Sequence, residues 1–277
     1  ITLFYNKDMF DAAGMPYPTG DWTYDDLMAA AIQLTKDTDN DGKTNQYGLW
    51  TDTWDMELFW SELIWANGGE ILSPDHTRTL IAEGGARDAW TYIDTLYKEG
   101  VMPTPATAGE YGGDLFQSGQ AAMTTIGHWA VPGYVASNIN FGVAPMPKGP
   151  QGAATSVNSA GFVVSKDSKN HDAAFAFIKF ALSESGQKRL AELGFSIPVL
   201  KSVAESDAYL KQAGSFDQKV FLDSLAFAHM KPVFKGYEEW AGVVGDGLIP
   251  VWDGEAELGP TLDEVVKSAD EILANNK

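Results

Sequence analysis

The sequence predicts an α/β protein, and three observations carry that prediction. Short apolar runs of strand length alternate along the chain with segments whose apolar residues recur at helical spacing. The connections between them are mostly short, and the chain contains neither an internal repeat of about 20 to 50 residues nor a low-complexity tract. With 277 residues, 44% of them hydrophobic, the chain can bury a full core in one large domain or in two smaller lobes.

The chain opens with a short strand that turns into a helix. Side chains alternate over residues 2–5 in the manner of a strand, and a turn begins at Asn6. The next helix falls within residues 20–37, where Thr23 and Asp26 have the three-residue spacing of a capping box. Its apolar face is formed by Leu27, Ala30, Ala31 and Leu34.

Two further helices precede a region of short strands. Helical spacing predicts one helix within residues 56–69, ended by paired glycines, and another at about residues 86–98. The pattern then changes to short apolar runs separated by Gly and Pro, which we expect to be buried strands at 121–127, 141–147 and 161–165. Two helices are predicted within residues 171–194, and helices dominate from there to the C-terminus.

Composition and charge exclude several classes of function. The net charge of -19 repels phosphate backbones, so we expect no nucleic-acid partner. No run approaches the roughly 20 apolar residues of a membrane span, and the first ten residues lack the features of a signal peptide, so any export signal is expected to be absent from this chain. The absence of cysteine, of a zinc-protease motif, of phosphate-binding loops and of a GxSxG motif favours binding over catalysis.

An acidic loop after the second helix matches the first half of a calcium-binding loop. Asp37, Asp39 and Asp41 have the required spacing and Asn45 falls at the ninth position, but Gly48 stands where the twelfth position needs Glu. Two interpretations stay open. Either a distant carboxylate completes a structural calcium site, or the three Asp side chains form Asx turns in a solvated loop. No other cofactor is expected.

Motifs along nearly the whole chain resemble those of one known family. The most specific are LFQSGQAAMTTIGHWAV at 115–131, similar to a Phe-x-x-Gly-x-x-Ala-Met strand ending in Gly-x-Trp, and FGVAPMPKGPQG at 141–152, similar to a proline-framed crossover. Further similar segments are 3–15, 20–37, 37–49, 158–203 and 261–273. In this order they resemble the family 1 extracellular solute-binding proteins of bacterial ABC importers, the maltose-binding-protein-like group.

The resemblance implies a periplasmic-binding-protein-like two-lobed fold of type II and a function in transport. Proteins of this family close two lobes on a carbohydrate by a hinge motion and deliver it to the membrane permease of an ABC transporter, and they are not enzymes. The implied location is extracytoplasmic, in the periplasm or on a cell-surface lipoprotein. The composition agrees, because flat aromatic rings and hydroxyl-binding carboxylates, both abundant here, are what sugar recognition requires.

The resemblance also implies how the chain divides between the lobes. Residues 1–150 are expected to form the first part of the C-terminal lobe, residues 151–205 to return to the N-terminal lobe, and residues 206–277 to supply helices that pack on the C-terminal lobe. We expect the N-terminal lobe to be incomplete. Its apolar face is then expected to be covered by the missing N-terminal segment or by another chain. That face contains Phe162, Val164, Phe175, Phe177, Ile178 and Phe180.

Candidate ligand-binding residues are aromatic or polar and lie near predicted strand ends and helix starts. Trp129 follows a predicted strand in the family's Gly-x-Trp position, where a stacking aromatic is implied, and His128 beside it can donate to a hydroxyl or be solvated. Trp54 and Asp55 precede a predicted helix. They either form a sugar-binding pair, or Trp54 fills the loop and Asp55 caps the helix. Trp60, one turn further on, is another candidate.

Four further candidates lie in the second half of the chain. Tyr237 and Trp240 have i,i+3 spacing and share a helix face, where the resemblance implies a stacking aromatic although such stripes usually pack in a core. Asn158 and Ser159 fall where the chain crosses between lobes, and either reach a sugar or form an ordinary polar turn.

Two other functions compete with sugar binding. A glycoside hydrolase has a similar acidic, Trp-rich composition, and its carboxylate pair could be Asp55 with Glu62 or Glu238 with Glu239. The sequence gives no means of setting either pair at the required separation. A calcium-dependent adhesion module is the third interpretation, and it rests on the acidic loop alone.

Overall fold

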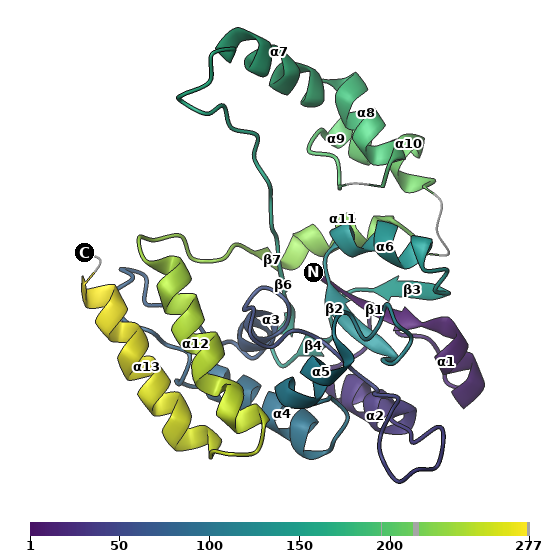
Figure 1. Ribbon diagram of the computed structural model, residues 1–277, viewed down its shortest axis with the longest axis vertical. Coiled ribbons are helices and arrows are strands. Elements are labelled where there is room, and N and C mark those ends of the chain that lie inside the picture. The colour runs from purple at the N-terminus through teal and green to yellow at the C-terminus, as the bar shows by residue number, and fades with distance from the viewer. Residues whose placement is uncertain (195, 213–215, 276–277) are drawn as a thin grey trace.

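A three-stranded antiparallel sheet lies at the centre of the larger part of the molecule (Figure 1). The computed structural model describes residues 1–194, 196–212 and 216–275. Strand β1 (Thr2–Asn6) lies between β2 (Met123–Ile126) and β3 (Phe141–Ala144). Residues 47–50 continue the sheet beside β2, since Tyr47 bridges to Ala121 and the backbone N–H of Trp50 donates to the Met123 carbonyl.

The alternation of side chains along β1 creates two cores, one on each face of the sheet. Leu3 and Tyr5 point into the larger core, and Phe4 points into the smaller one. All five residues of β1 are buried, as expected of a central strand covered on both faces.

Helices from both ends of the chain enclose the larger core. They are α1 (Lys7–Ala13), α2 (Tyr24–Leu34), α3 (Trp60–Ala66), α4 (Gly85–Lys98), α12 (Tyr237–Trp252) and α13 (Leu258–Asn275). The capping box predicted at the start of α2 is present, with Thr23 and Asp26 exchanging hydrogen bonds. Helices α12 and α13 pack side by side against α4, so the C-terminus of the described chain rests on elements from its first hundred residues (Figure 1).

Shorter elements surround the smaller core and connect the larger units. Near the smaller core lie α5 (Pro105–Tyr111), η1 (His128–Ala130), α6 (Val131–Ala136), α11 (Lys219–Asp223) and η2 (Ser224–Phe227). A two-residue hairpin joins β4 (Lys148–Gly149) to β5 (Gly152–Ala153), and β6 (Thr155–Ser156) pairs in parallel with β7 (Ala228–His229). The chain leaves the larger body directly after β6.

A smaller helical group stands apart from this body, at the end of the extended segment 157–170 (Figure 1). It contains α7 (His171–Ala181), α8 (Glu184–Glu192), α9 (Lys201–Ala204) and α10 (Asp207–Leu210). Its own core is small and is built from Ala191, Val203 and Tyr209. Because α10 packs on α8 and α9, the group extends past residue 205, where the sequence analysis placed the division.

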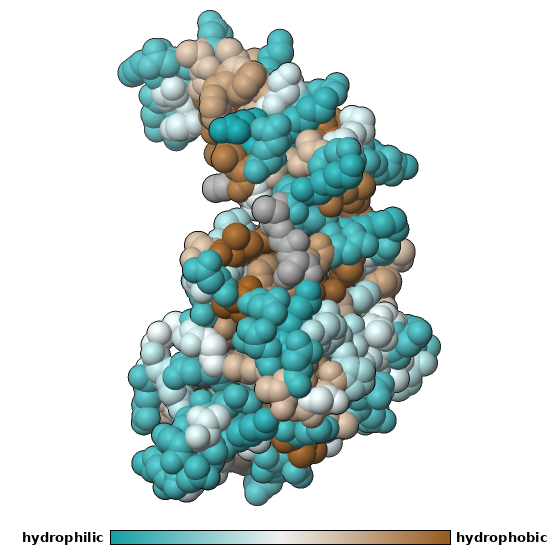
Figure 2. Space-filling view, turned by 90° about the vertical axis from the view of Figure 1, so that its right-hand side faces the viewer, coloured by the Kyte–Doolittle hydropathy of each residue, from teal (hydrophilic) through white to brown (hydrophobic). Residues whose placement is uncertain are grey.

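The helical group exposes much of its apolar surface. Phe175, Phe177 and Phe180 are each more than half exposed, and so are Leu193 and Val199. Figure 2 shows apolar side chains at the surface of this group and of the narrow region that joins it to the body. The strand expected at 161–165 is wrong: the segment is extended but pairs with no described strand, so Phe162 and Val163 are exposed. An apolar run of strand length forms a strand only where a partner edge is available.

Truncating one phenylalanine in the helical group and one in the body is expected to change the free energy of unfolding by very different amounts. Phe177→Ala in this chain should change the free energy of unfolding by no more than about 0.5 kcal/mol, because the ring is exposed. Phe116→Ala should cost about 3–5 kcal/mol, because that ring is fully buried beneath the sheet. Urea denaturation of both variants measures this difference, and equal losses would contradict the division described here.

Candidate ligand-binding site

Trp129 presents an exposed aromatic ring just after the end of β2. Its side chain is 53% exposed, and it lies in the short helix η1 that begins directly after Gly127. A Cβ atom at Gly127 would come within 2.0 Å of the indole, so only glycine lets the ring lie across the backbone there. The Gly-x-Trp pattern therefore has a physical role, which is to hold one indole face open to solvent.

Two hydroxyl groups, one from β2 and one from β6, hold the loop before α3 in place. The Thr125 hydroxyl of β2 donates to the Leu58 carbonyl at 2.6 Å and also contacts the Thr51 hydroxyl at 2.6 Å. The Ser156 hydroxyl oxygen of β6 lies 2.9 Å from the Glu57 carbonyl oxygen and shares its single proton between this carbonyl and Glu62. The loop 55–58 is thus fixed between the end of β2 and the point where the chain leaves the body.

This loop carries a charged cluster that the sequence analysis missed. Lys231 Nζ lies 2.7 Å from Glu57 Oε1 and 4.9 Å from the centroid of the Tyr237 ring. The Glu57 side chain is only 14% exposed, and its carboxylate raises the pKa of Lys231. A hollow of about 380 Å³ opens beside them, lined by Lys231 to Phe234 and by Gly236 to Glu238. Of the predicted residues, Tyr237 and the half-buried Asp55 belong to this region.

Three predicted ligand-binding residues are buried, and for them the prediction is wrong. Trp60 is 1% exposed and packs on Trp90 at 5.0 Å between ring centroids. Trp240 is fully buried, and its indole N–H donates to the Thr79 hydroxyl at 3.0 Å. His128 is 4% exposed. None of the three can touch a ligand without disrupting a core.

His128 is a core residue because η1 turns it inward while Trp129 turns outward. Its Nε2 contacts Gln218 Oε1 at 3.2 Å, and its ring lies edge-on to Phe221. Burial lowers the pKa of His128 to about 4, and the contact with Gln218 opposes this shift only in part. The imidazole is therefore neutral at pH 7 and serves the packing of the smaller core.

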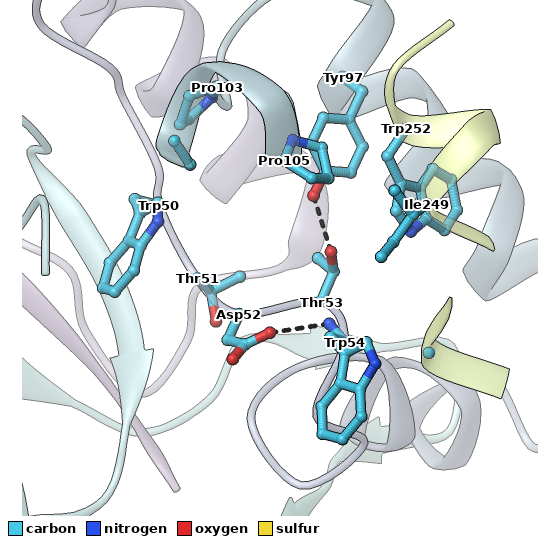
Figure 3. A pocket seen from close by; sticks show the side chains of 12 residues that line it. Trp50, Thr51, Asp52, Thr53, Trp54, Tyr97, Pro103, Pro105, Ile249 and Trp252 are labelled. Atoms are coloured by element: carbon cyan, nitrogen blue, oxygen red, sulfur yellow. Dashed lines mark hydrogen bonds between the residues drawn. The ribbon is translucent and has the colours of Figure 1, made fainter. Parts of the chain in front are cut away.

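Trp54 occupies a different place from Trp129 and the Glu57 cluster. Its indole N–H donates to Asp246 Oδ1 at 2.7 Å, and its backbone N–H donates to Asp52 Oδ1 at 2.9 Å. It lines a second hollow with Trp50 and Thr53 (Figure 3). Asp55 follows it and caps the turn ahead of α3, where its Oδ1 accepts the Glu57 backbone N–H at 2.9 Å.

The remaining polar candidates lie where the chain leaves the body. Asn158 and Ser159 are exposed at the start of the extended segment 157–170. Trp65 of α3 is only half-buried and stacks on His229 of β7 at 4.5 Å between ring centroids and 12° between ring planes. Helical spacing alone does not show this pair, because His229 comes from β7, a strand far along the chain that pairs with β6.

The acidic loop brings its three carboxylates together. Ligand atoms of Asp37, Asp39 and Asp41 lie within 4.8 Å of one another. Each carboxylate also accepts a backbone N–H of the same loop, as Asx turns do, while Asn45 accepts from the Thr38 N–H and hydroxyl instead of joining the group. Calcium binding at this loop stays a prediction.

The carboxylates nominated for hydrolysis are not arranged as a catalytic pair. Glu62 is fully buried in α3, where it accepts hydrogen bonds from the Ser156 N–H at 3.0 Å and from the Ser156 and Ser61 hydroxyls. Burial raises the pKa of Glu62, and the hydrogen bonds from Ser156 oppose the rise. Glu238 and Glu239 are both exposed on the first turn of α12.

Comparison with known proteins decides the family. A family model of the bacterial extracellular solute-binding proteins matches residues 1–216. The chain belongs to this family. It is 27% identical to a putative binding protein of Brucella abortus and 25% identical to the galactooligosaccharide-binding protein of Bacillus subtilis, with 98% and 96% of this chain covered. The chain spans 65% and 62% of the length of those two relatives.

Solved structures confirm the predicted fold class of this family member. An ABC substrate-binding protein of Listeria monocytogenes, determined in complex with cycloalternan, matches 99% of this chain with a TM-score of 0.83 and 25% identity, and the match covers 69% of that protein. The maltose/maltodextrin-binding domain of Bdellovibrio bacteriovorus, at 21% identity and a TM-score of 0.79, shares the fold. Within the described residues, no helix is both long and apolar enough to cross a membrane.

Acidification is expected to destabilise the smaller core through His128. Because its folded-state pKa of about 4 lies below the ordinary value of 6.5, the unfolded chain binds the proton first, and stability falls as the pH falls from 6.5 toward 4. Between pH 7.5 and pH 5 this contribution is about 2 kcal/mol.

Denaturant titration at both pH values, for the wild type and His128→Gln, isolates the effect. The variant should lose about 2 kcal/mol less than the wild type over this interval, whatever its absolute stability. Identical pH dependences would show that His128 is not held neutral by burial.

Proposed function

We propose that this chain is part of the carbohydrate-binding component of an ABC importer, and that it captures a sugar or oligosaccharide for delivery to a membrane permease. One observation carries the proposal: the exposed indole of Trp129 follows directly on β2, whose Thr125 is hydrogen-bonded to the polar loop 55–58, in a member of a solute-binding family. An exposed indole offers the apolar face of a pyranose a stacking surface, and nearby carboxylates can bind its hydroxyls. The family's role in solute binding and the oligosaccharide named in the Bacillus subtilis relative support this choice.

The proposed mechanism is closure of the helical group toward the body. The extended segment 157–170 joins the two parts, and they also touch: the Tyr209 ring lies 5.7 Å from the His128 ring, and Ile197 packs against both cores. Closure therefore combines a change of backbone torsions in the connection with a rearrangement of these contacts. A ligand that touches both parts only when they approach shifts the population toward the closed form. Trp129, Glu57 and Lys231 belong to the body, and Asn158 and Ser159 lie on the connection itself.

No catalytic step belongs to this proposal, and no cofactor is required. The buried position and hydrogen bonds of Glu62 suit a structural role, and Glu238 and Glu239, which are neighbours in the sequence, are both exposed. We place the protein outside the cytoplasm, in the periplasm or on a surface lipoprotein, which agrees with the extracellular family to which it belongs.

We further propose that another segment of a longer protein, or another chain, covers the apolar face of the helical group. Phe175, Phe177 and Phe180 are exposed on α7, and burying rings of this size gains about 1.5–3 kcal/mol each. The extra length of the relatives is one source for such a cover.

Truncation of Trp129 is expected to remove sugar binding without affecting the fold. Trp129→Ala should weaken binding of an oligosaccharide by about 1–3 kcal/mol, or roughly 5- to 150-fold, with an unchanged melting temperature. Trp240→Ala is the matched control, since the same truncation in the core should lower stability by about 3–5 kcal/mol. Isothermal calorimetry on a protein with both lobes complete measures the affinity, and an unchanged value in Trp129→Ala would reject the site. A reducing-sugar assay that detected turnover would reject the binding function.

The cover on the helical group predicts a different outcome for Phe177 in a longer protein. There Phe177→Ala should destabilise by more than about 1.5 kcal/mol, because the ring is then buried. In residues 1–277 alone the same change is expected to be neutral. Neutrality in both contexts would show that nothing covers this face.

A further inference from the structure

The hollow beside Glu57 and Lys231 carries the charged groups of the candidate site. Its volume is about 380 Å³, and the polar residues among those that line it are Lys231, Tyr237 and Glu238. Glu57 does not line it, but Glu57 Oε1 lies 2.7 Å from Lys231 Nζ. We name this hollow the charged hollow.

The Glu57 carboxylate is held in place by the loop that carries it. The Glu57 backbone N–H donates to Asp55 Oδ1 at 2.9 Å, and the Leu58 carbonyl accepts from the Thr125 hydroxyl at 2.6 Å. The Glu57 side chain is 14% exposed, whereas the Lys231 side chain is 40% exposed. Because a carboxylate this far buried needs a charged partner, Lys231 stays paired with Glu57, and its charge is compensated before any ligand arrives.

Around Lys231 the negative charges exceed the positive ones. Three carboxylates act on this ammonium group, those of Glu57, Glu238 and Asp55, and each of them raises its pKa. Glu57 compensates it, and neither Asp55 nor Glu238 forms an ion pair within the described residues. Lys235 is exposed and does not line the hollow. In a chain of net charge -19, two uncompensated carboxylates make the potential of the charged hollow negative.

The charged hollow still offers hydrogen bonds to an uncharged ligand. Burial raises the pKa of the Tyr237 hydroxyl, and the neighbouring carboxylates raise it further, so the hydroxyl keeps its proton at pH 7 and can donate. The ammonium group of Lys231 has three donors and needs one for Glu57. The exposed carboxylate of Glu238 can accept from a hydroxyl. Donors and acceptors of this kind match sugar hydroxyls.

We propose that the Glu57–Lys231 ion pair makes the charged hollow selective for uncharged sugars, and that Glu57 is the residue that sets this specificity. The inference rests on the proposed carbohydrate function and names its class of ligand. An acidic sugar or a sugar phosphate meets a lysine that is already compensated and two carboxylates that repel it. Drawing Lys231 away to pair with the ligand would leave the Glu57 charge buried and unpaired. A neutral sugar incurs neither cost.

The test compares a neutral disaccharide with its acidic analogue by calorimetry on this chain at pH 7. The probes are α-1,4-galactobiose and digalacturonate, which share their linkage and differ by a carboxylate at C6 of each sugar. The wild type is expected to bind galactobiose at least about tenfold more tightly than digalacturonate.

Two variants should move this preference in opposite directions. Glu57→Gln should reduce it at least about threefold, because the amide keeps the shape of the side chain but leaves the charge of Lys231 free for the acidic sugar. Lys231→Gln, at a more exposed position, should increase it, because the hollow then loses its ammonium group. Glu239→Gln makes the same charge change as Glu57→Gln at an exposed position outside the lining, and should retain the wild-type preference.

A small anion separates failure of this inference from failure of the proposed function. In chains labelled at lysine, the Lys231 side-chain NMR signal is assigned by its loss in Lys231→Gln. Acetate should shift it in Glu57→Gln but not in the wild type or in Glu239→Gln. This response without binding of any neutral oligosaccharide would keep the charge selection and reject the carbohydrate function. Equal affinities of the wild type for the two disaccharides, a preference unchanged in both Glu57→Gln and Lys231→Gln, or an acetate shift in the wild type would overturn the inference.

Discussion

The buried carboxylate of Glu62 holds together the point on which both the fold and the candidate site depend. It accepts hydrogen bonds from the backbone N–H and the hydroxyl of Ser156, the last residue of β6 before the chain leaves the body. The same Ser156 hydroxyl contacts the Glu57 carbonyl. The start of the extended connection and the loop that carries Glu57 are thus fixed to one side chain in α3. A buried carboxyl group with these partners is costly to disturb, since losing one partner leaves the other unsatisfied.

Much of the body follows from local sequence signals. The capping box at Thr23 starts α2 as expected, and the alternation over residues 2–5 sets the two cores because β1 is central. The Gly-x-Trp pattern correctly indicates an exposed indole, since the glycine is needed for the ring to lie across it. Trp60 and Trp240 could not be assigned from spacing, because an aromatic on a helix face looks the same whether that face meets a core or a ligand. The decision depends on tertiary packing.

Other features of the site depend on contacts between distant parts of the chain. Glu57 and Lys231 form an ion pair although they lie far apart in the sequence. In the same way, the Trp54 indole packs on Gly245 of α12. No local pattern links such residues. The segment 161–165 shows the same limit, because its apolar residues have strand character but no described strand lies beside them. The exposure of the apolar face of α7 has the same cause. Its side chains are suited to burial, but no described element covers them.

The central claim is that ligand binding closes the helical group toward the body about the connection anchored by Ser156. Energy transfer between two dyes tests it most directly, and the chain has no native cysteine, so Lys179→Cys on α7 and Asp21→Cys near the start of α2 give a unique labelled pair. A saturating oligosaccharide should raise the transfer efficiency, and Trp129→Ala should require a higher sugar concentration for the same rise. Saturable binding with no change in transfer efficiency would contradict the account.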